Sequence, residues 1–276
     1  MMFEPEFLKS DQFNVWQEKS RHKRDDLLSA PRSQHRFDER IWQDFKNDVL
    51  IPFLGRCSYC EGRYAAGEFC EAEHYRPKNA VTEDRKPVSH PGYYWLAYEW
   101  HNLLLACKKC NSTHPDRDQT KRASHPGKLC EFPVGAVRIS SPSSNPDNWF
   151  KELQAEEPML LHPYCDDPSE HIEARCDGWI WYKTERGRVT IEVCHLNRKE
   201  LRIERRLAEE QVRYRAAHIW GNLARELEKE RFSRNDPFST YLNCKLAEEL
   251  RNRNAETSRR LEAIFGVTGV RNHGAL

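Results

Sequence analysis

The spacing of apolar residues predicts a helical N-terminal region. Within residues 36–50 they recur at every fourth position, which places them on one face of an α-helix. The members of this stripe are Phe37, Ile41, Phe45 and Val49. Pro52 and Gly55 then interrupt the pattern, because both residue types disfavour the continuation of a helix. We expect residues 1–54 to form a helical region that ends just before the first pair of cysteines.

The middle of the chain has a less regular pattern. In residues 55–130 the apolar runs are short, as in a module that a metal ion organises in place of a large hydrophobic core. Residues 140–146 are rich in serine and proline, which is typical of a linker. Two later runs, 178–182 and 189–193, are rich in β-branched and aromatic residues. With Glu185-Arg186-Gly187 between them as a turn, they predict a β-hairpin.

The C-terminal part is predicted to be helical. Asn197 is followed by Glu200 three residues later, which has the form of a helix-capping box, and a long amphipathic pattern begins there. Further helices are expected at about 237–252 and 255–265. The fold class that these patterns predict is α+β and mainly helical, with a small metal-bound core flanked by N-terminal and C-terminal helices. The expected regions are 1–54 (helical), 55–130 (metal-organised module), 131–195 (linker and small β region) and 196–276 (helical).

Composition and charge narrow the class of protein. The 276 residues are 38% hydrophobic and 11% aromatic, which is enough for a folded globular protein. The net charge of +1, from 44 basic and 43 acidic residues, does not by itself indicate binding to a polyanion. No apolar run approaches the roughly 18 residues needed to cross a membrane. Because the N-terminus also lacks the pattern of a secretory signal, we expect a cytoplasmic location.

Several common catalytic motifs are absent from the sequence. It contains no G-x4-G-K-[ST] phosphate loop, no G-x-S-x-G elbow and no H-E-x-x-H helix. An ATPase, a serine hydrolase and a zincin-type protease are therefore not indicated. If nucleotide regulates this protein, a partner has to supply the nucleotide site.

Four of the ten cysteines form two Cys-x-x-Cys pairs, Cys57 with Cys60 and Cys107 with Cys110. A two-residue spacer lets both sulfurs of a pair face one ion, and two pairs complete the tetrahedral S4 shell of a structural Zn2+ site. A redox-active pair is the alternative, but a redox dithiol does not require a second pair. We expect the other six cysteines to behave as small buried hydrophobic residues. They are Cys70, Cys130, Cys165, Cys176, Cys194 and Cys244.

Polar residues of a distinctive kind lie around the two cysteine pairs. Glu73-His74 lies between the pairs, Asn102 lies five residues before the second pair, and Asn111 directly follows it. This arrangement resembles the HNH endonucleases. Their ββα-metal motif has an acid and a histidine on its first strand, an asparagine at the turn, and an asparagine or histidine on the helix. The nine-residue step from Asn102 to Asn111 matches the usual interval of that family.

The resemblance implies roles for these residues. His74 would be the general base, since a neutral imidazole can take a proton from water at neutral pH. Glu73 and Asn111 would hold a catalytic Mg2+ or Mn2+ ion, which stabilises the charge on the leaving 3′ oxygen. Asn102 would hydrogen-bond the backbone across the turn and orient the strand that presents His74. Cleavage by the family mechanism would leave 5′-phosphate and 3′-hydroxyl ends.

A narrower resemblance is also present. Residues 57–61, 73–78 and 94–104 are similar to the PtuB-type HNH proteins of Septu and retron anti-phage systems, and segments 157–161 and 190–198 are similar to later parts of the same group. This similarity implies the nuclease effector of a defence system that acts with an ATPase partner of the SMC or ABC type.

Basic residues near the motif are candidates for contacts with phosphate. Arg76 and Lys78 follow His74, while Lys108 and Lys109 lie inside the second cysteine pair. Such contacts would position a nucleic acid without reading its sequence. A basic face that is merely solvated is the alternative.

Three features near the motif stay open. The family often has a lysine at the position of His114, so His114 could join the metal ion, contact a phosphate or do neither. The aromatic residues of 93–100 could stack on unpaired bases, although core packing is the expected role. Asp166-Asp167-Pro168 is expected to be a turn and a helix cap rather than a second metal site.

Two other functions are compatible with these residues. One is a zinc-dependent binding module in which the HNH motif is inactive. The other is an autonomous restriction-type HNH enzyme that needs no partner. DNA is the expected substrate from the family, but RNA stays open because no element that reads bases is recognisable.

Overall fold

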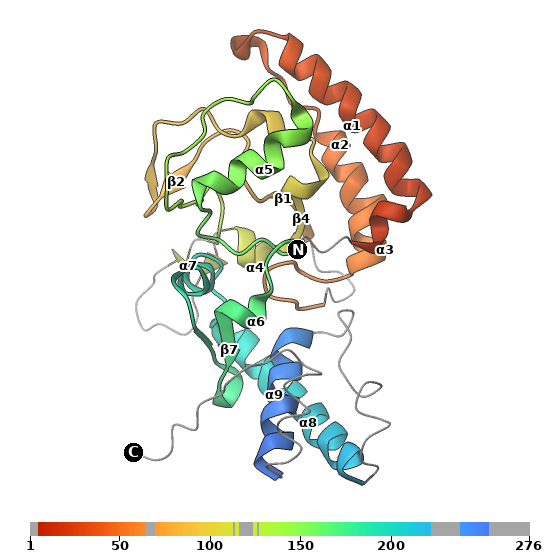
Figure 1. Ribbon diagram of the computed structural model, residues 1–276, viewed down its shortest axis with the longest axis vertical. Coiled ribbons are helices and arrows are strands. Elements are labelled where there is room, and N and C mark those ends of the chain that lie inside the picture. Colours follow the sequence, from red (N-terminus) through yellow and green to blue (C-terminus); the bar gives the residue numbers. More distant parts are fainter. Residues whose placement is uncertain are drawn as a thin grey trace.

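The computed structural model describes residues 5–63, 70–112, 114–115, 124–125, 127–221 and 238–253. About half of the structure is helical, and the strands form small two-stranded sheets. Helices α1 to α3 lie beside a central hairpin, β1 and β4, in the upper part of Figure 1, and the two helices α8 and α9 form the lower part. The chain is therefore a mixed α and β protein.

The N-terminal region is helical as predicted. Helix α1 (Asp11–Ser29) begins after Ser10, whose side chain accepts a hydrogen bond from the Phe13 amide at 3.2 Å. Helix α2 (Glu39–Asp44) continues as a π-helical turn, η3 (Phe45–Leu50), and as α3 (Ile51–Leu54). Gly55 ends this run with a φ of 59°, a left-handed conformation that suits glycine. The predicted apolar stripe faces inward, since Ile41, Phe45 and Val49 are buried.

The central hairpin and the helix after it position the candidate site. Strand β1 (Cys70–His74) pairs antiparallel with β4 (Leu103–Cys107), so that His74 lies opposite Leu103 and Cys70 lies opposite Cys107. Strand β4 is almost wholly buried because four apolar residues, 103–106, occupy it in sequence. The short helix α4 (Lys108–Asn111) follows β4 directly.

Several other elements are short. The remaining strand pairs are β2 (Thr82–Glu83) with β3 (Lys86–Pro87), β5 (His114–Pro115) with β6 (Ser124–His125), and β7 (Ile172–Ala174) with β8 (Ile180–Tyr182). The remaining short α-helices are α5 (Trp149–Leu153) and α6 (Pro168–His171). Single 3-10 turns are η1 (Glu6–Lys9), η2 (Arg32–Gln34), η4 (Tyr94–Leu96), η5 (Trp100–Asn102), η6 (Pro146–Asn148), η7 (Gln154–Glu156) and η8 (Cys176–Gly178).

The predicted hairpin of 178–182 and 189–193 is wrong in its second half. Residues 180–182 form β8, but residues 185–193 form helix α7 (Glu185–Val193). The Thr184 side chain caps this helix by accepting from the Gly187 amide at 3.2 Å. Arg188 adds ion pairs to Glu185 and Glu192, one turn away on either side. Capping and i to i+4 pairing thus outweigh the preference of the β-branched residues for a strand.

The C-terminal helices are α8 (Lys199–Gly221) and α9 (Ser239–Arg253), which pack against each other (Figure 1). The expected helix at 255–265 lies outside the described residues. The prediction that Asn197 caps α8 is wrong. The Asn197 side-chain amide instead pairs with the backbone of Ile180, accepting from the amide at 3.0 Å and donating to the carbonyl at 2.8 Å.

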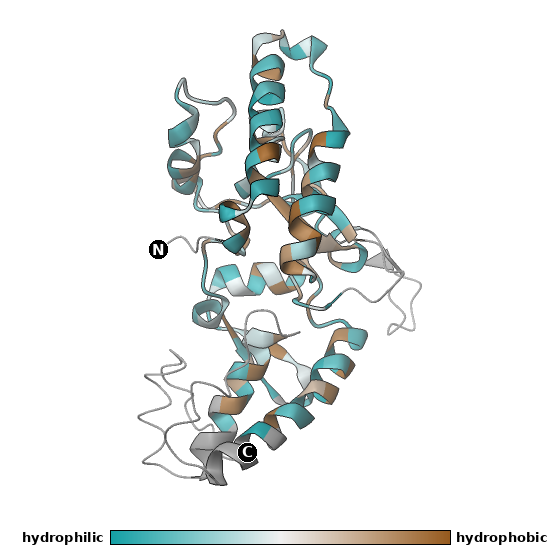
Figure 2. Cartoon of the chain, turned by 90° about the vertical axis from the view of Figure 1, so that its right-hand side faces the viewer, coloured by the Kyte–Doolittle hydropathy of each residue, from teal (hydrophilic) through white to brown (hydrophobic). Residues whose placement is uncertain are grey.

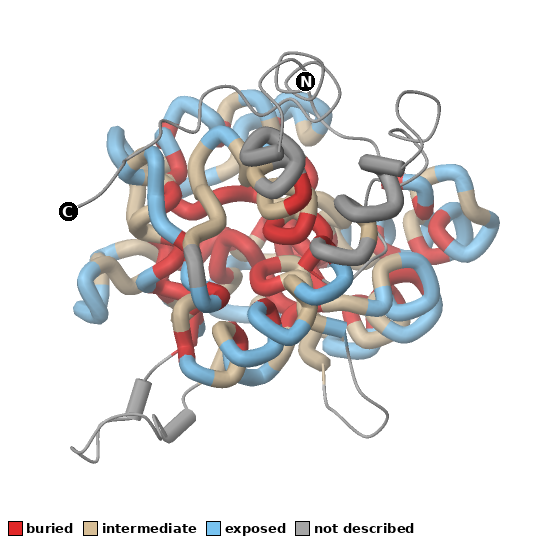
Figure 3. Tube along the Cα trace, turned by 90° about the horizontal axis from the view of Figure 1, so that it is seen from below, coloured by how far each residue is buried: buried red, intermediate tan, exposed pale blue. Residues whose placement is uncertain are grey.

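The aromatic cluster near residue 95 belongs to the core, as expected. Tyr93, Trp95 and Tyr98 are each at most 2% exposed. Figure 3 shows the buried residues in the interior of the trace, and Figure 2 shows hydrophilic residues on the outward faces of the long helices. The Asp167 side chain caps α6 by accepting from the Ser169 amide, which confirms the prediction of a helix cap there.

Two histidines, the buried His162 and the partly buried His101, make the fold sensitive to acid. Burial lowers the pKa of His101 to about 3 and the pKa of His162 to about 4. In the unfolded chain both titrate near pH 6.5. Between these values the unfolded state binds more protons, so the free energy of unfolding falls as the pH falls. The fall is at most about 1.4 kcal/mol per pH unit for each histidine.

Urea denaturation at several pH values between about 7 and 5 tests this expectation. The variant His101→Phe should reduce the pH slope of the unfolding free energy by the contribution of one histidine, at most about 1.4 kcal/mol per pH unit. The variant His22→Phe, at an exposed position, should leave the slope unchanged. Equal slopes for wild type and His101→Phe would contradict the assignment.

Candidate metal centre and active site

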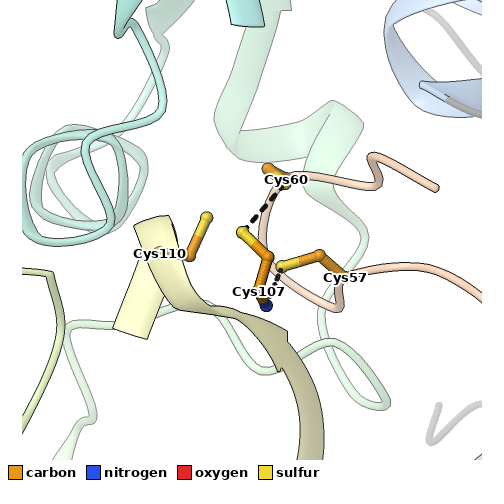
Figure 4. A group of neighbouring side chains, drawn as sticks. All are labelled: Cys57, Cys60, Cys107 and Cys110. Carbon is orange, nitrogen blue, oxygen red and sulfur yellow. Dashed lines mark hydrogen bonds between the residues drawn. The ribbon is translucent and has the colours of Figure 1, made fainter. Parts of the chain in front are cut away.

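The four cysteines of the two Cys-x-x-Cys pairs meet as predicted. Their sulfur atoms all lie within 4.8 Å of one another, and the Cys60 and Cys107 sulfurs are 3.9 Å apart (Figure 4). Tetrahedral zinc with Zn–S bonds of about 2.3 Å needs sulfurs about 3.8 Å apart. The Ser58 amide donates to the Leu105 carbonyl at 2.7 Å, which ties the first pair to β4. The four residues thus fit a structural Zn2+ ion.

Arg198 contacts this cluster from the C-terminal half of the chain. Its guanidinium donates to the Cys110 sulfur at 3.3 Å and to the Cys107 sulfur at 3.7 Å, and the residue is 5% exposed. Hydrogen bonds from the other three thiols, together with the charge of Arg198, lower the pKa of Cys60 well below its ordinary value. Four thiolates around one Zn2+ carry two excess negative charges, so the guanidinium compensates part of that charge.

One face of β1 carries two carboxylates toward helix α4. Glu71 and Glu73 are two positions apart and therefore point to the same side of the strand. Glu71 accepts hydrogen bonds from the Asn111 side-chain amide at 2.7 Å and from the Ser112 hydroxyl at 3.0 Å. The Asn111 Oδ1 atom is buried and has no hydrogen-bond partner among the described residues. Two carboxylates and an unpartnered amide oxygen are the hard oxygen donors that Mg2+ or Mn2+ prefers.

Glu73 is paired with a lysine that the sequence analysis did not identify. The Lys128 ammonium lies 2.6 Å from Glu73 Oε1, and both side chains are buried. Burial raises the pKa of Glu73, and the charge of Glu71 adds to this, while Lys128 opposes it.

His74 is held on the other side of β1. Its Nε2 atom lies 3.1 Å from the Ala97 carbonyl, and its ring makes an edge contact with Trp42 at 5.0 Å between centroids. Because a carbonyl only accepts, Nε2 carries the hydrogen and the lone pair is on Nδ1. Burial and the nearby charge of Lys78 lower the pKa of His74 well below its ordinary value, so the ring is neutral at neutral pH.

The structure therefore brings together only part of the predicted site. Glu73 and Asn111 lie on the α4 side of β1, together with Glu71, whereas His74 contacts the N-terminal helices. Glu71 was missed, although the alternation of side chains along β1 would have placed it beside Glu73. Lys128 was missed because nothing in the local sequence relates it to residue 73.

Asn102 makes the backbone hydrogen bonds that were expected of it. Its Oδ1 accepts from the Arg76 amide at 2.7 Å, and its amide group donates to the Arg76 carbonyl at 3.1 Å. The residue is 1% exposed. These bonds join the end of β1 to the turn before β4, so Asn102 orients the segment that carries His74.

The basic residues differ in what they can contact. Arg76 is 1% exposed and pairs with the buried Glu156 at 3.1 Å, so it is a core residue rather than a phosphate contact. The Lys78 ammonium lies 4.6 Å from the centre of the Trp42 ring. Lys108 and Lys109 are exposed on α4. His114 begins β5, and its side chain lies outside what the structure describes.

In the part of the chain that the structure describes, none of the helices combines the length and the apolar character that crossing a membrane requires.

Comparison with known proteins relates this chain to Septu proteins. It is 33% identical over 190 residues to the Septu protein PtuB of Bacillus mycoides (strain KBAB4), which covers 66% of this chain and 56% of the relative. It is also 33% identical over 147 residues to the Septu protein PtuA of the same strain, covering 53% of this chain and 18% of that protein. PtuB of Bacillus thuringiensis is 27% identical over 143 residues, which are 51% of this chain and 37% of the relative.

The chain is thus homologous to Septu PtuB, and the resemblance found in the sequence is supported to that extent. The matched regions span about half of the length of the first PtuB relative and less of the other two. No protein-family model and no solved structure matches the chain.

The contact of Arg198 with the cysteine cluster predicts an effect on zinc retention. Arg198→Met should release zinc to a chromophoric chelator about ten times faster than wild type, or more, because partners of metal ligands typically contribute about 10–100-fold in affinity. The matched control is Arg206→Met, at an exposed arginine of α8, which should release zinc at the wild-type rate. Identical rates for all three proteins would show that Arg198 does not stabilise the metal centre.

Proposed function

We propose that this protein is an HNH-type endonuclease that hydrolyses phosphodiester bonds of nucleic acid, DNA above all. The observation that carries this proposal is the group of Glu71, Glu73 and Asn111 on one side of the hairpin, directly beside the four-cysteine cluster. The order of the elements, two antiparallel strands followed by a short helix, also agrees with it.

We propose the following roles for the residues of this site. Glu73 and Asn111 would hold one Mg2+ or Mn2+ ion, with Glu71 as a further ligand. The ion would stabilise the charge on the leaving 3′ oxygen. His74 would take the proton of the attacking water at Nδ1, the ring nitrogen whose lone pair is left by the bond to Ala97. Lys108 and Lys109 would contact phosphates from the exposed side of α4. The products would carry 5′-phosphate and 3′-hydroxyl ends.

The homology to Septu proteins supports a place in anti-phage defence. We propose that the chain is the nuclease effector of such a system and acts with an ATPase partner of the SMC or ABC type. The sequence has no phosphate loop of its own, so ATP hydrolysis would have to occur on that partner.

Two observations favour a second candidate function. His74 is 6% exposed beneath Trp42, and Glu73 is neutralised by Lys128. An inactive zinc-stapled module that only binds nucleic acid or protein would tolerate this arrangement. An autonomous restriction-type enzyme is the third candidate, and it differs from the proposal in needing no partner.

The variant His74→Ala separates the nuclease from the binding module. It should retain zinc and the wild-type circular dichroism spectrum but lose cleavage by about 100-fold or more, since general base catalysis contributes about that much. His22→Ala, at an exposed histidine, is the matched control and should cleave like wild type. Unchanged cleavage by His74→Ala would exclude His74 as the base.

The substrate and the partner are tested in one assay. Supercoiled plasmid, single-stranded DNA and total RNA are incubated with the zinc-loaded protein, with and without Mg2+ or Mn2+, alone and with the product of the neighbouring gene. We expect metal-dependent cleavage of DNA that requires the partner and ATP. Cleavage by the protein alone would favour the autonomous enzyme, and binding without cleavage in every mixture would favour the inactive module.

A further inference from the structure

A short segment, residues 127–129, connects the two halves of the candidate site, and we call it the strap. Its backbone pairs with the end of α4. The Gly127 amide donates to the Ser112 carbonyl at 3.1 Å, the Lys128 amide to the Cys110 carbonyl at 2.8 Å, and the Leu129 amide to the Asn111 carbonyl at 2.8 Å. The strap is therefore fixed to the residue that carries the Asn111 amide.

The close approach of the strap to α4 depends on a glycine. A Cβ atom at position 127 would lie 2.5 Å from the carbonyl carbon of Asn111, which is closer than any side chain can come. The Gly127 carbonyl also accepts from the Arg85 guanidinium at 2.7 Å. The backbone position of Lys128 is thus constrained on both sides.

The Lys128 side chain extends from the strap to the end of β1. Its ammonium donates to Glu73 Oε1 at 2.6 Å, to the His74 carbonyl at 3.0 Å and to the Leu129 carbonyl at 3.4 Å. These three acceptors use all three N–H groups, and the side chain is 0% exposed. Lys128 therefore has no donor left for a phosphate and does not face solvent, which excludes a direct contact with substrate.

We propose that Lys128 is the positioning residue of this site: it holds the Glu73 carboxylate and the His74 backbone at a fixed place relative to Asn111. Its ammonium donates to Glu73 Oε1. The other carboxylate oxygen, Oε2, is then the one that would bind a divalent cation. The backbone of the strap holds the other ligand, Asn111. This inference rests on the proposed function, since it assigns a geometric role around the same cation.

Positioning and simple electrostatics make opposite predictions for metal binding. A positive charge 2.6 Å from a ligand oxygen repels a divalent cation, so its removal should strengthen binding if the ligands stay in place. If Lys128 positions Glu73, its removal should weaken binding, because the carboxylate loses its orientation. The direction of the change therefore decides between the two.

The experiment measures Mn2+ binding to the zinc-loaded full-length protein by electron paramagnetic resonance, without nucleic acid. The variants are Lys128→Met, Lys128→Gln, Glu73→Gln and, as a matched control at an exposed lysine, Lys86→Met. We expect Lys128→Met to bind Mn2+ at least about 10-fold more weakly than wild type, in the range seen for partners of metal ligands. Lys128→Gln, which keeps an N–H donor, should recover part of the loss, and Lys86→Met should bind like wild type.

The outcomes separate this inference from the proposed function. Equal or tighter Mn2+ binding by Lys128→Met, with weaker binding by Glu73→Gln, would overturn the positioning role and leave the metal site standing. Absence of Mn2+ binding in wild type, or no effect of Glu73→Gln, would overturn the metal site and the positioning role together. If Lys128→Met loses zinc or its fold, Lys128→Gln is compared with wild type, and equal or tighter binding then overturns the proposal.

Discussion

The cluster of four sulfurs is the interaction on which the rest of the structure depends. It joins the loop that follows the N-terminal helices to the end of β4 and to the short helix α4. A helix of four residues is too short to be stable alone, so the cluster, together with the strap, holds Asn111 in place. The hairpin contributes a buried strand, but the cluster determines where the polar residues after it lie.

Much of this centre was predictable because its residues belong to short motifs with characteristic spacing, even though the two cysteine pairs are far apart in the chain. The Cys-x-x-Cys spacing identifies the cluster, and the step from Asn102 to Asn111 places one asparagine before β4 and the other after it. Alternation along β1 explains why Glu73 faces α4 while His74 faces Trp42. The apolar stripe of the N-terminal helices was readable for the same reason, since its period is a local property.

The remainder could not be read from the chain because it depends on distant partners. Lys128 is 55 positions from Glu73, and Arg76 finds its counter-charge in Glu156, 80 positions later. A basic residue near the Glu73-His74 motif looks the same in sequence whether it is buried in an ion pair or exposed to solvent. The predicted strand at 189–193 was wrong for a different, local reason: the Thr184 cap and the ion pairs of Arg188 with Glu185 and Glu192 favour helix α7 over the strand preference of the single residues.

The guanidinium of Arg198 links the start of helix α8 to the four-cysteine cluster. Arg198 directly precedes α8, and its charge rests on the sulfurs that anchor α4. A protein that bound the lower helices and turned α8 about its axis would have to pull this charge away from the sulfurs or carry the sulfurs with it. A movement of α8 would then be transmitted to the candidate site through Arg198, and also through the ion pair between Lys109 of α4 and Glu200 of α8.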